Sequence, residues 1–212
     1  MPDALFAFEA VVVEAGGRRI LDEVTAELPR QGVTCLVGPS GSGKSTMLRL
    51  CNRLEVPTAG VVRFRGTDLR DLDPLAHRRR VGMVFQRPTP FPGTVRDNLL
   101  VARPGTDDSV LGAALERAAL PEHFLDRVAD DLSGGEAQRM CLARTLVTDP
   151  EVLLMDEPTS SLDADAAKEL ERLARQLADD GVPVVWVSHD LAQVDRIADA
   201  RLLVAQGRVQ RG

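Results

Sequence analysis

A glycine-rich loop constrains this chain more than any other part of its sequence. The loop reads Gly38-Pro39-Ser40-Gly41-Ser42-Gly43-Lys44-Ser45-Thr46 and fits the pattern GxxxxGK[ST]. The apolar run 33–37 before it has the length of a buried strand, and the residues from 44 onward have the apolar spacing of a helix. A strand, a tight loop and a helix in this order favour a parallel α/β sheet with an anion-binding turn at its edge.

Each residue type in the loop suits a phosphate chain. Glycines let backbone N–H groups approach phosphate oxygens without an intervening Cβ, and the helix N-terminus adds positive potential. Lys44 offers a compact ammonium to the β- and γ-phosphates, and the Ser45 hydroxyl is a hard oxygen ligand for Mg²⁺. Of 26 basic residues only Lys44 and Lys168 are lysines, so the lysine at 44 indicates a chemical requirement. The alternative is a flexible turn before a helix.

Two carboxylates follow a second apolar strand, expected at 152–155. Asp156 stands at the carboxyl end of that strand, where ligands bind in open α/β sheets, and can hold the Mg²⁺ shell. Glu157 points in a different direction and can accept a proton from an attacking water, as a general base does. The alternative is a helix N-cap followed by an acidic first turn, because Asp, Glu and Pro are all favoured there.

The segment Leu132-Ser133-Gly134-Gly135-Glu136 opens another expected helix. Ser133 and Glu136 have the spacing of a capping box, which is the purely structural interpretation. That interpretation leaves two glycines in the first turn unexplained, where each costs about 1 kcal/mol relative to alanine. We therefore expect Ser133, Gly134 and Gly135 to form a second phosphate-contacting surface.

The remaining pattern alternates strands with helices and indicates a mainly parallel sheet covered on both faces. Prolines at alternate positions exclude a regular element over 87–93, and a helical insert is expected from about 94 to 131, with Val110, Leu111, Ala114 and Leu115 on one face. Further strands are expected at 6–13, 61–64, 81–85, 184–187 and 201–205, and further helices at 134–148, 164–179 and 191–198. Helix 164–179 has one core-facing stripe, formed by Leu170, Leu173 and Leu177.

We expect one domain over 1–212, with a catalytic core and β subdomain at 1–86 and 149–212 and a helical subdomain at 87–148.

Composition excludes several other classes of protein. The net charge of −6 argues against a nucleic-acid binder that works by bulk electrostatics. No apolar run reaches the 18 or so residues of a membrane-spanning helix, and the first residues lack a secretion signal. Three widely spaced cysteines, Cys35, Cys51 and Cys141, fit neither a disulfide framework nor a zinc site. These observations predict a cytosolic protein.

Taken together, the motifs resemble those of the nucleotide-binding subunits of ABC transporters, in order and over nearly the whole chain. The phosphate loop (Walker A) is followed by Gln86 (the Q-loop), Leu132–Glu136 with Gln138 (the signature), Asp156-Glu157 (Walker B and the catalytic glutamate), Ser160–Asp163 (the D-loop) and Ser188-His189-Asp190 (the switch histidine). The resemblance implies a P-loop NTPase fold of the RecA-like type, with an N-terminal antiparallel β subdomain and an inserted α-helical subdomain.

The resemblance also implies roles that the residues alone do not. Two such subunits stack head-to-tail, and each ATP with its Mg²⁺ lies between one copy's phosphate loop and the other's signature. Gln86 would contact Mg²⁺ or the attacking water, His189 the γ-phosphate, and Asp163 the other copy. A transmembrane permease subunit would hold the ATPase at the inner face of the membrane. Its candidate contacts are Phe91 and Val95, for which internal packing is the equal alternative. His77 and His123 match no motif.

Two questions stay open at this stage. ABC ATPases usually stack adenine on an aromatic residue, but the corresponding stretch 13–17 has none and the chain has no tyrosine, so weak base discrimination is expected. The cargo is undecided, because residues 81–92 resemble phosphate-import ATPases whereas 184–190 resemble small metal-export ATPases. An alternative function is an ATP-dependent regulatory module that signals through a membrane protein without transport.

Overall fold

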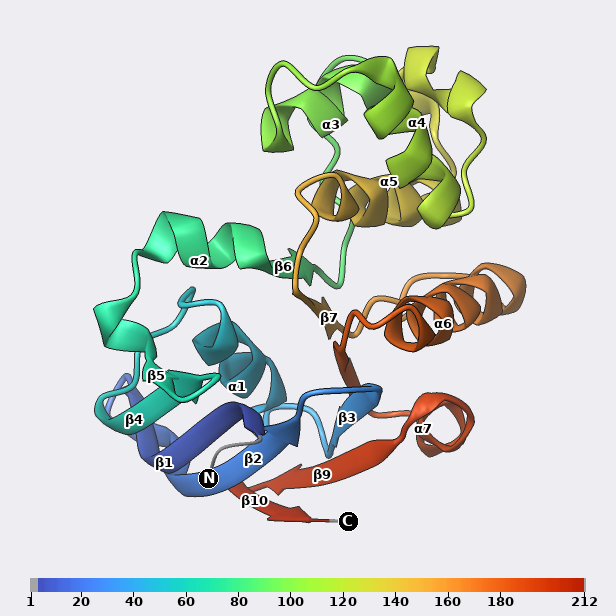
Figure 1. Ribbon diagram of the computed structural model, residues 1–212. Coiled ribbons are helices and arrows are strands. Elements are labelled where there is room, and N and C mark those ends of the chain that lie inside the picture. The colour runs from blue at the N-terminus through green and yellow to red at the C-terminus, as the bar shows by residue number, and fades with distance from the viewer. Residues whose placement is uncertain (1–3, 212) are drawn as a thin grey trace.

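A six-stranded, mainly parallel sheet forms the centre of the protein. The structure, a computed structural model, describes residues 4–211. The strand order is β10-β9-β3-β8-β7-β6 (Figure 1). Its members are β3 (Val33–Val37), β6 (Val81–Val84), β7 (Val152–Asp156), β8 (Val184–Ser188), β9 (Ala200–Ala205) and β10 (Arg208–Arg211), of which only β10 pairs antiparallel.

Parallel pairing brings the functional ends of three strands to one edge of this sheet. Val37 pairs with Ser188, and Asp156 pairs with Val187, so β3, β7 and β8 end side by side. Every residue of these three strands is buried, because helices or the second sheet cover both faces. Side chains in the loops that follow the strands therefore converge at this edge.

A smaller antiparallel sheet packs against one side of the central sheet. Its order is β2-β1-β4-β5, built from β1 (Ala4–Ala15), β2 (Arg18–Pro29), β4 (Ala59–Phe64) and β5 (Thr67–Asp68). Between the sheets lies α1 (Lys44–Cys51), whose Met47 and Leu48 join Phe6 and Phe64 in one apolar core. This core fixes the helix that follows the phosphate loop. A 3₁₀ turn (Leu69–Asp71) and α2 (Pro74–Arg80) then lead to β6.

Residues 87–148 are mostly helical and gather at one end of the molecule (Figure 1). They comprise α3 (Val95–Ala102), α4 (Asp108–Arg117), 3₁₀ turns at Glu122–Asp126 and Ala129–Asp131, and α5 (Gly134–Leu146). Their apolar side chains are continuous with the core beneath α6 (Ala164–Asp179) and α7 (Leu191–Ile197), so these helices are tightly joined to the central sheet.

Several expectations are confirmed to the residue, and others are corrected. The helix at 164–179 and its buried stripe of Leu170, Leu173 and Leu177 are as predicted. The insert 94–131 is divided into four short helices, and Val110 is 40% exposed instead of buried. The helix α2 and the strand β10 were not predicted. Their short, charged sequences carry little periodic apolar signal.

The expected surface role of Val95 is wrong. Thr94 and Asp97 form a capping box at the start of α3, and this cap turns Val95 into the core, where it is fully buried. Phe91, four residues earlier, is 44% exposed and remains available at the surface.

Two further expectations concern the cysteines and the membrane. Cys35, Cys51 and Cys141 are all unpaired and buried, and burial raises the pKa of the Cys35 thiol to about 12. Within residues 4–211, no helix combines the length and the apolar character needed to cross a membrane.

The packing of α6 can be tested by truncating its central leucine. We expect Leu170→Ala to lower the free energy of unfolding by about 2–5 kcal/mol, because Leu170 is fully buried and its loss leaves a cavity. Lys168→Ala, an exposed change in the same helix, should stay within about 0.5 kcal/mol of wild type. Urea denaturation measures both, and equal stabilities for the two variants would contradict the packing.

Candidate functional site

Two glycines of the phosphate loop are required by the way the loop packs. Gly38 has a φ of 153°, and a Cβ there would lie 2.0 Å from the carbonyl oxygen of Val204 in β9. Gly43 has a φ of 106°, and its Cβ would lie 2.7 Å from Leu21 in β2. The loop is therefore pressed between the two sheets in a conformation that only glycine allows.

The rest of the loop is open toward solvent. Pro39, Ser40 and Gly41 are exposed, whereas Ser42 is buried and its hydroxyl has no hydrogen-bond partner. Thr46 lies half-buried in the first turn of α1. The eight-residue helix α1 begins directly at the loop, so its free N–H groups face this open side of the loop.

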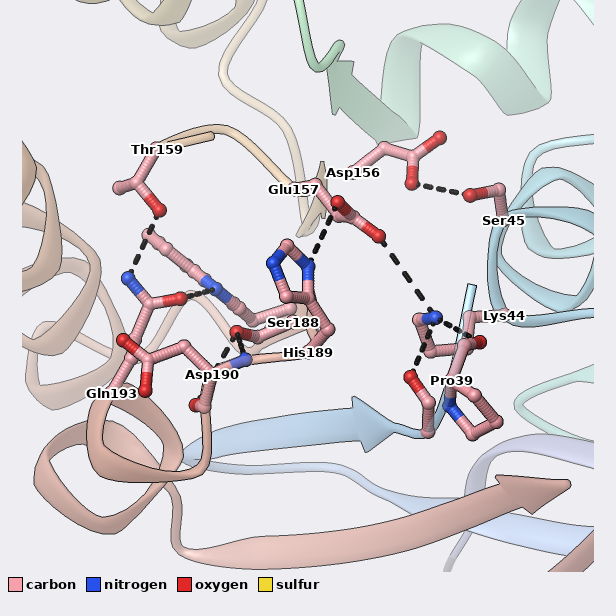
Figure 2. Close-up of polar contacts among 12 residues, drawn as sticks. Pro39, Lys44, Ser45, Asp156, Glu157, Thr159, Ser188, His189, Asp190 and Gln193 are labelled. Atoms are coloured by element: carbon pink, nitrogen blue, oxygen red, sulfur yellow. Dashed lines mark hydrogen bonds and ion pairs between the residues drawn. The ribbon is translucent and has the colours of Figure 1, made fainter. Parts of the chain in front are cut away.

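Lys44 is held in place by the backbone of its own loop. Its Nζ donates hydrogen bonds of 2.9 Å to the carbonyl oxygens of Gly38 and Pro39, and lies 3.9 Å from Oε1 of Glu157 (Figure 2). The residue is only 4% exposed. The ammonium therefore places a fixed positive charge at the edge of the sheet, beside the carboxylate of Glu157, the residue that follows β7.

Ser45, in the first turn of α1, contacts Asp156, the last residue of β7. The Ser45 hydroxyl donates a 2.7 Å hydrogen bond to Oδ1 of Asp156 (Figure 2). The guanidinium of Arg49, one turn further along α1, lies 3.6 Å from Oδ2 of Asp156. One hydroxyl and one carboxylate are hard oxygen donors, the kind Mg²⁺ prefers. Among residues 4–211, no group of three or more His, Cys, Asp or Glu side chains could hold a metal by itself. The donor set therefore fits a Mg²⁺ ion that takes its remaining ligands from water and nucleotide phosphates.

Glu157 and His189 face each other at the ends of neighbouring strands. Nδ1 of His189 lies 3.2 Å from Oε2 of Glu157 (Figure 2). Glu157 has a φ of 43°, a left-handed conformation that is unfavourable for glutamate and that its surroundings must maintain. The His189 side chain is 64% exposed. A water between this pair and a phosphate would have a carboxylate ready to accept its proton.

The predicted capping box at Ser133 is present. The Glu136 backbone N–H donates to the Ser133 hydroxyl at 3.3 Å, and the Ser133 N–H donates to Oε2 of Glu136 at 2.8 Å. The bond from the Ser133 backbone lowers the pKa of the Glu136 carboxyl below its ordinary value, so this cap is charged at neutral pH.

Packing requires one of the two glycines after Ser133 but not the other. A Cβ on Gly135 would lie 2.9 Å from the Cβ of Ala166, so Gly135 is needed for the close approach of α5 to α6. A Cβ on Gly134 would meet nothing within 4 Å. Packing thus explains Gly135, which the sequence argument assigned to phosphate contact, and leaves Gly134 as the unexplained glycine.

The signature and the D-loop share one open groove. Asp163 caps α6 by accepting hydrogen bonds from the backbone N–H groups of Asp165 and Ala166. The groove is lined by Ser133, Gly134, Gly135, Arg139, Asp163 and their neighbours. The D-loop begins at Ser160, whose backbone N–H donates a 3.2 Å hydrogen bond to the carbonyl oxygen of Glu157. Among the described residues, no hydrogen bond, ion pair or shared pocket connects Ser133, Gly134 or Asp163 to Lys44 or Glu157. The structure therefore brings together one set of predicted residues at the sheet edge and a second set elsewhere.

Gln86 lies in the loop that follows β6 and belongs to neither set. It is exposed and follows Phe85, whose carbonyl oxygen accepts a 2.9 Å hydrogen bond from Nε2 of Gln138 in α5. Gln138 is fully buried, so the signature helix is tied to the segment of Gln86 by an internal bond. His77 is also buried and bonded to the Cys51 carbonyl, a structural role.

Sequence reasoning missed three polar residues beside the site. A hydrogen-bonded network joins Gln193 to Thr159 and Glu171, and Gln193 and Thr159 line the same pocket as Glu157 and His189. No short motif contains them, because they come from three separate elements. Arg49 was also missed, although its position four residues after Ser45 on one helix face could have indicated it.

Comparisons with known proteins identify the family of this chain. A family model described as "ABC transporter" matches residues 21–160. The chain is 46% identical over 202 residues to the Protein STAR1 of Oryza sativa subsp. japonica. The aligned region covers 92% of this chain but only 58% of that protein. It is 42% identical over 210 residues to the phosphate import ATP-binding protein PstB 3 of Natronomonas pharaonis, covering 92% of this chain and 76% of that one.

Solved structures show the same likeness. The cbiO1 protein of Clostridium perfringens, part of the ABC transporter complex cbiONQ, superposes with a TM-score of 0.89 at 26% identity, over 98% of this chain and 87% of that chain. A bacterial Atm1-family ABC exporter with ATP bound superposes with a TM-score of 0.85 at 31% identity, over 97% of this chain and 38% of that chain. The chain therefore belongs to the ABC transporter family and carries the ATP-binding ATPase domain of that family.

Proposed function

We propose that this chain hydrolyses ATP to energise transport by a separate transmembrane permease, and that it acts as a homodimer closed on two ATP molecules. The observation that supports this most is the division of the site into two halves that line different pockets. One half lies at the sheet edge and consists of Lys44, Ser45, Asp156, Glu157 and His189. The other half faces an open groove and consists of Ser133, Gly134 and Asp163. A second copy would complete each half.

In this proposal each residue at the sheet edge has one role. Lys44 and the N–H groups of the loop 38–46 neutralise the phosphates, and Ser45 and Asp156 hold Mg²⁺, with Gln86 as a further ligand or water contact. When bound, Mg²⁺ neutralises charge on the phosphate oxygens. Glu157 accepts a proton from the attacking water, and His189 contacts the γ-phosphate. Positioning and charge neutralisation carry most of the rate enhancement.

The other copy would contribute the start of α5. The free N–H groups at this helix N-terminus carry positive potential, and Gly134 leaves them open to an anion. Ser133 adds a hydroxyl, and Asp163 contacts the first copy across the interface. No nucleic acid takes part.

The permease would bind where the helical part meets the central sheet. A groove there is lined by Phe85, Phe91 and Val101, which are 44%, 44% and 60% exposed, an unusual amount of apolar surface for one site. The guanidinium of Arg144 lies 4.6 Å from the centre of the Phe91 ring and steadies it. Through this partner the chain would sit on the inner face of the membrane, as a peripheral protein of the cytoplasm.

We further propose that residues 87–148 act as a helical subdomain, attached to a catalytic core at 1–86 and 149–212. The Gln138–Phe85 hydrogen bond spans the junction between the two, next to both Gln86 and the permease groove. Such a junction would transmit movement between the nucleotide and the permease.

The general base can be tested with Glu157→Gln. We expect this variant to bind ATP but to lose at least about 100-fold in turnover, because amide oxygen is a poor proton acceptor. It should also accumulate as a dimer in Mg-ATP, as seen by light scattering after size exclusion. Adding Ser133→Arg to Glu157→Gln should preserve ATP binding and prevent the dimer. A Glu157→Gln protein that stays monomeric and turns over ATP at the wild-type rate would overturn the proposal.

The chain offers a matched pair of lysines for testing phosphate binding. Lys44→Ala should weaken ATP binding by at least about tenfold, because it removes charge-assisted hydrogen bonds to the phosphates. Lys168→Ala removes the other lysine, which is exposed on α6, and should leave the affinity unchanged. Isothermal titration calorimetry measures both, and equal affinities for the two variants would exclude Lys44 from the phosphate site.

The absence of an aromatic residue at 13–17 predicts weak discrimination between bases. Stacking on an aromatic side chain contributes about 1–3 kcal/mol per base, and this chain has none to offer there. We therefore expect the dissociation constants for ATP and GTP to agree within about tenfold. ATP binding that is more than tenfold tighter than GTP binding would show that another group recognises adenine.

A further inference from the structure

A buried amide lines the same pocket as Glu157 and His189. The residue is Gln193 in α7, which is only 4% exposed. Its Nε2 donates hydrogen bonds of 3.0 Å to Oγ1 of Thr159 and 2.9 Å to Oε1 of Glu171, and its Oε1 accepts a 3.1 Å bond from the indole N–H of Trp186. One side chain thereby joins four segments of the fold (Figure 2 shows Gln193 with Thr159).

The chemistry of the partners fixes the orientation of this amide. An indole N–H can only donate, so it must meet the amide oxygen, and the Glu171 carboxylate can only accept, so it must meet the amide nitrogen. A flipped amide would place donor against donor and oxygen against oxygen. Gln193 therefore has a single acceptable rotamer, which makes it a rigid connection.

Two of the three partners of Gln193 are close in sequence to Glu157 or His189. Thr159 comes two residues after Glu157, Trp186 comes three residues before His189, and Gln193 comes one helical turn after His189. All of these except Trp186 also line one pocket. The left-handed backbone of Glu157, with a φ of 43°, needs external contacts to persist, and the Thr159 bond is such a contact.

We propose that Gln193 is a positioning residue, which sets the place of Glu157 relative to His189 by binding Thr159 on one side and anchoring α7 on the other. This inference deepens the proposed ATPase mechanism and rests on it. In this role Gln193 acts through Thr159 and α7, not on the nucleotide itself. Its effect is on the rate of the chemical step, because small errors in the position of a general base are costly.

The network also explains why the residue is a neutral amide. Glu171 is buried, which by itself would raise the pKa of its carboxyl, but the bonds from Arg196 and Gln193 outweigh burial and lower that pKa. Glu171 is therefore ionised at neutral pH. A glutamate at 193 would place a second carboxylate within hydrogen-bond distance of the first, and the two would repel.

Three variants of the full-length protein test the inference. Gln193→Leu keeps the volume but removes every hydrogen bond, and Gln193→Glu introduces the repulsion. Both should lower kcat for ATP by at least about tenfold while the KM and the dissociation constant for Mg-ATP change less than about twofold. Gln193→Glu combined with Glu171→Gln exchanges the two groups and should recover most of kcat. The exposed change Gln31→Glu serves as the control and should match wild type.

Trp186 supplies a second readout that does not depend on turnover. It is the single tryptophan of the chain, so its indole N–H gives one resonance in a ¹H–¹⁵N spectrum. Mg-ATP should shift this resonance in the wild type, because Glu157 is joined to Trp186 through Thr159 and Gln193. The shift should be absent in Gln193→Leu.

The outcomes separate this inference from the proposed function. A wild-type protein without ATP turnover would refute the proposed function, and the indole resonance would then decide the inference. The role of Gln193 would be overturned by a wild-type kcat in both single variants, or by an indole resonance that does not shift on addition of Mg-ATP. It would also be overturned if the kcat of the double variant were no higher than that of Gln193→Glu.

Discussion

The ammonium of Lys44 lies almost fully buried at the carboxyl edge of the parallel sheet, where it donates to the carbonyl oxygens of Gly38 and Pro39. A charge in such a place is costly unless it is paired, and here two carbonyls and the nearby Glu157 carboxylate compensate it. The loop can wrap around the ammonium only because Gly38 fits against β9 and Gly43 fits against β2. The packing of two sheets thus prepares a positive site before any phosphate arrives.

The same edge explains why the other polar residues are arranged as they are. Because β3, β8 and β7 are adjacent parallel strands, the residues that follow them lie close together at one edge of the sheet. Ser45 reaches Asp156, and His189 reaches Glu157, each through one direct contact. The helix start at Ser133 is built separately, by its own capping box, and faces away into its own groove. In the proposed dimer, a second copy would complete each of these two sites.

Much of this arrangement was predictable from local sequence, and the remainder was not, for identifiable reasons. The strand 33–37, the helix 164–179 and the Ser133–Glu136 capping box follow from periodicity and capping chemistry, which act over a few residues. The burial of Val95 and the contact between Gly135 and Ala166 depend on tertiary packing, which no local pattern reveals. The Gln193 network joins residues from four elements and shows no fixed spacing in the sequence.

The most direct test of this account is a structure of the Glu157→Gln protein determined with Mg-ATP. The account predicts two copies related by a two-fold axis, with each γ-phosphate in hydrogen-bond contact with Lys44 of one copy and Ser133 of the other. A nucleotide bound at the phosphate loop while Ser133 of every copy contacts no ligand would contradict it.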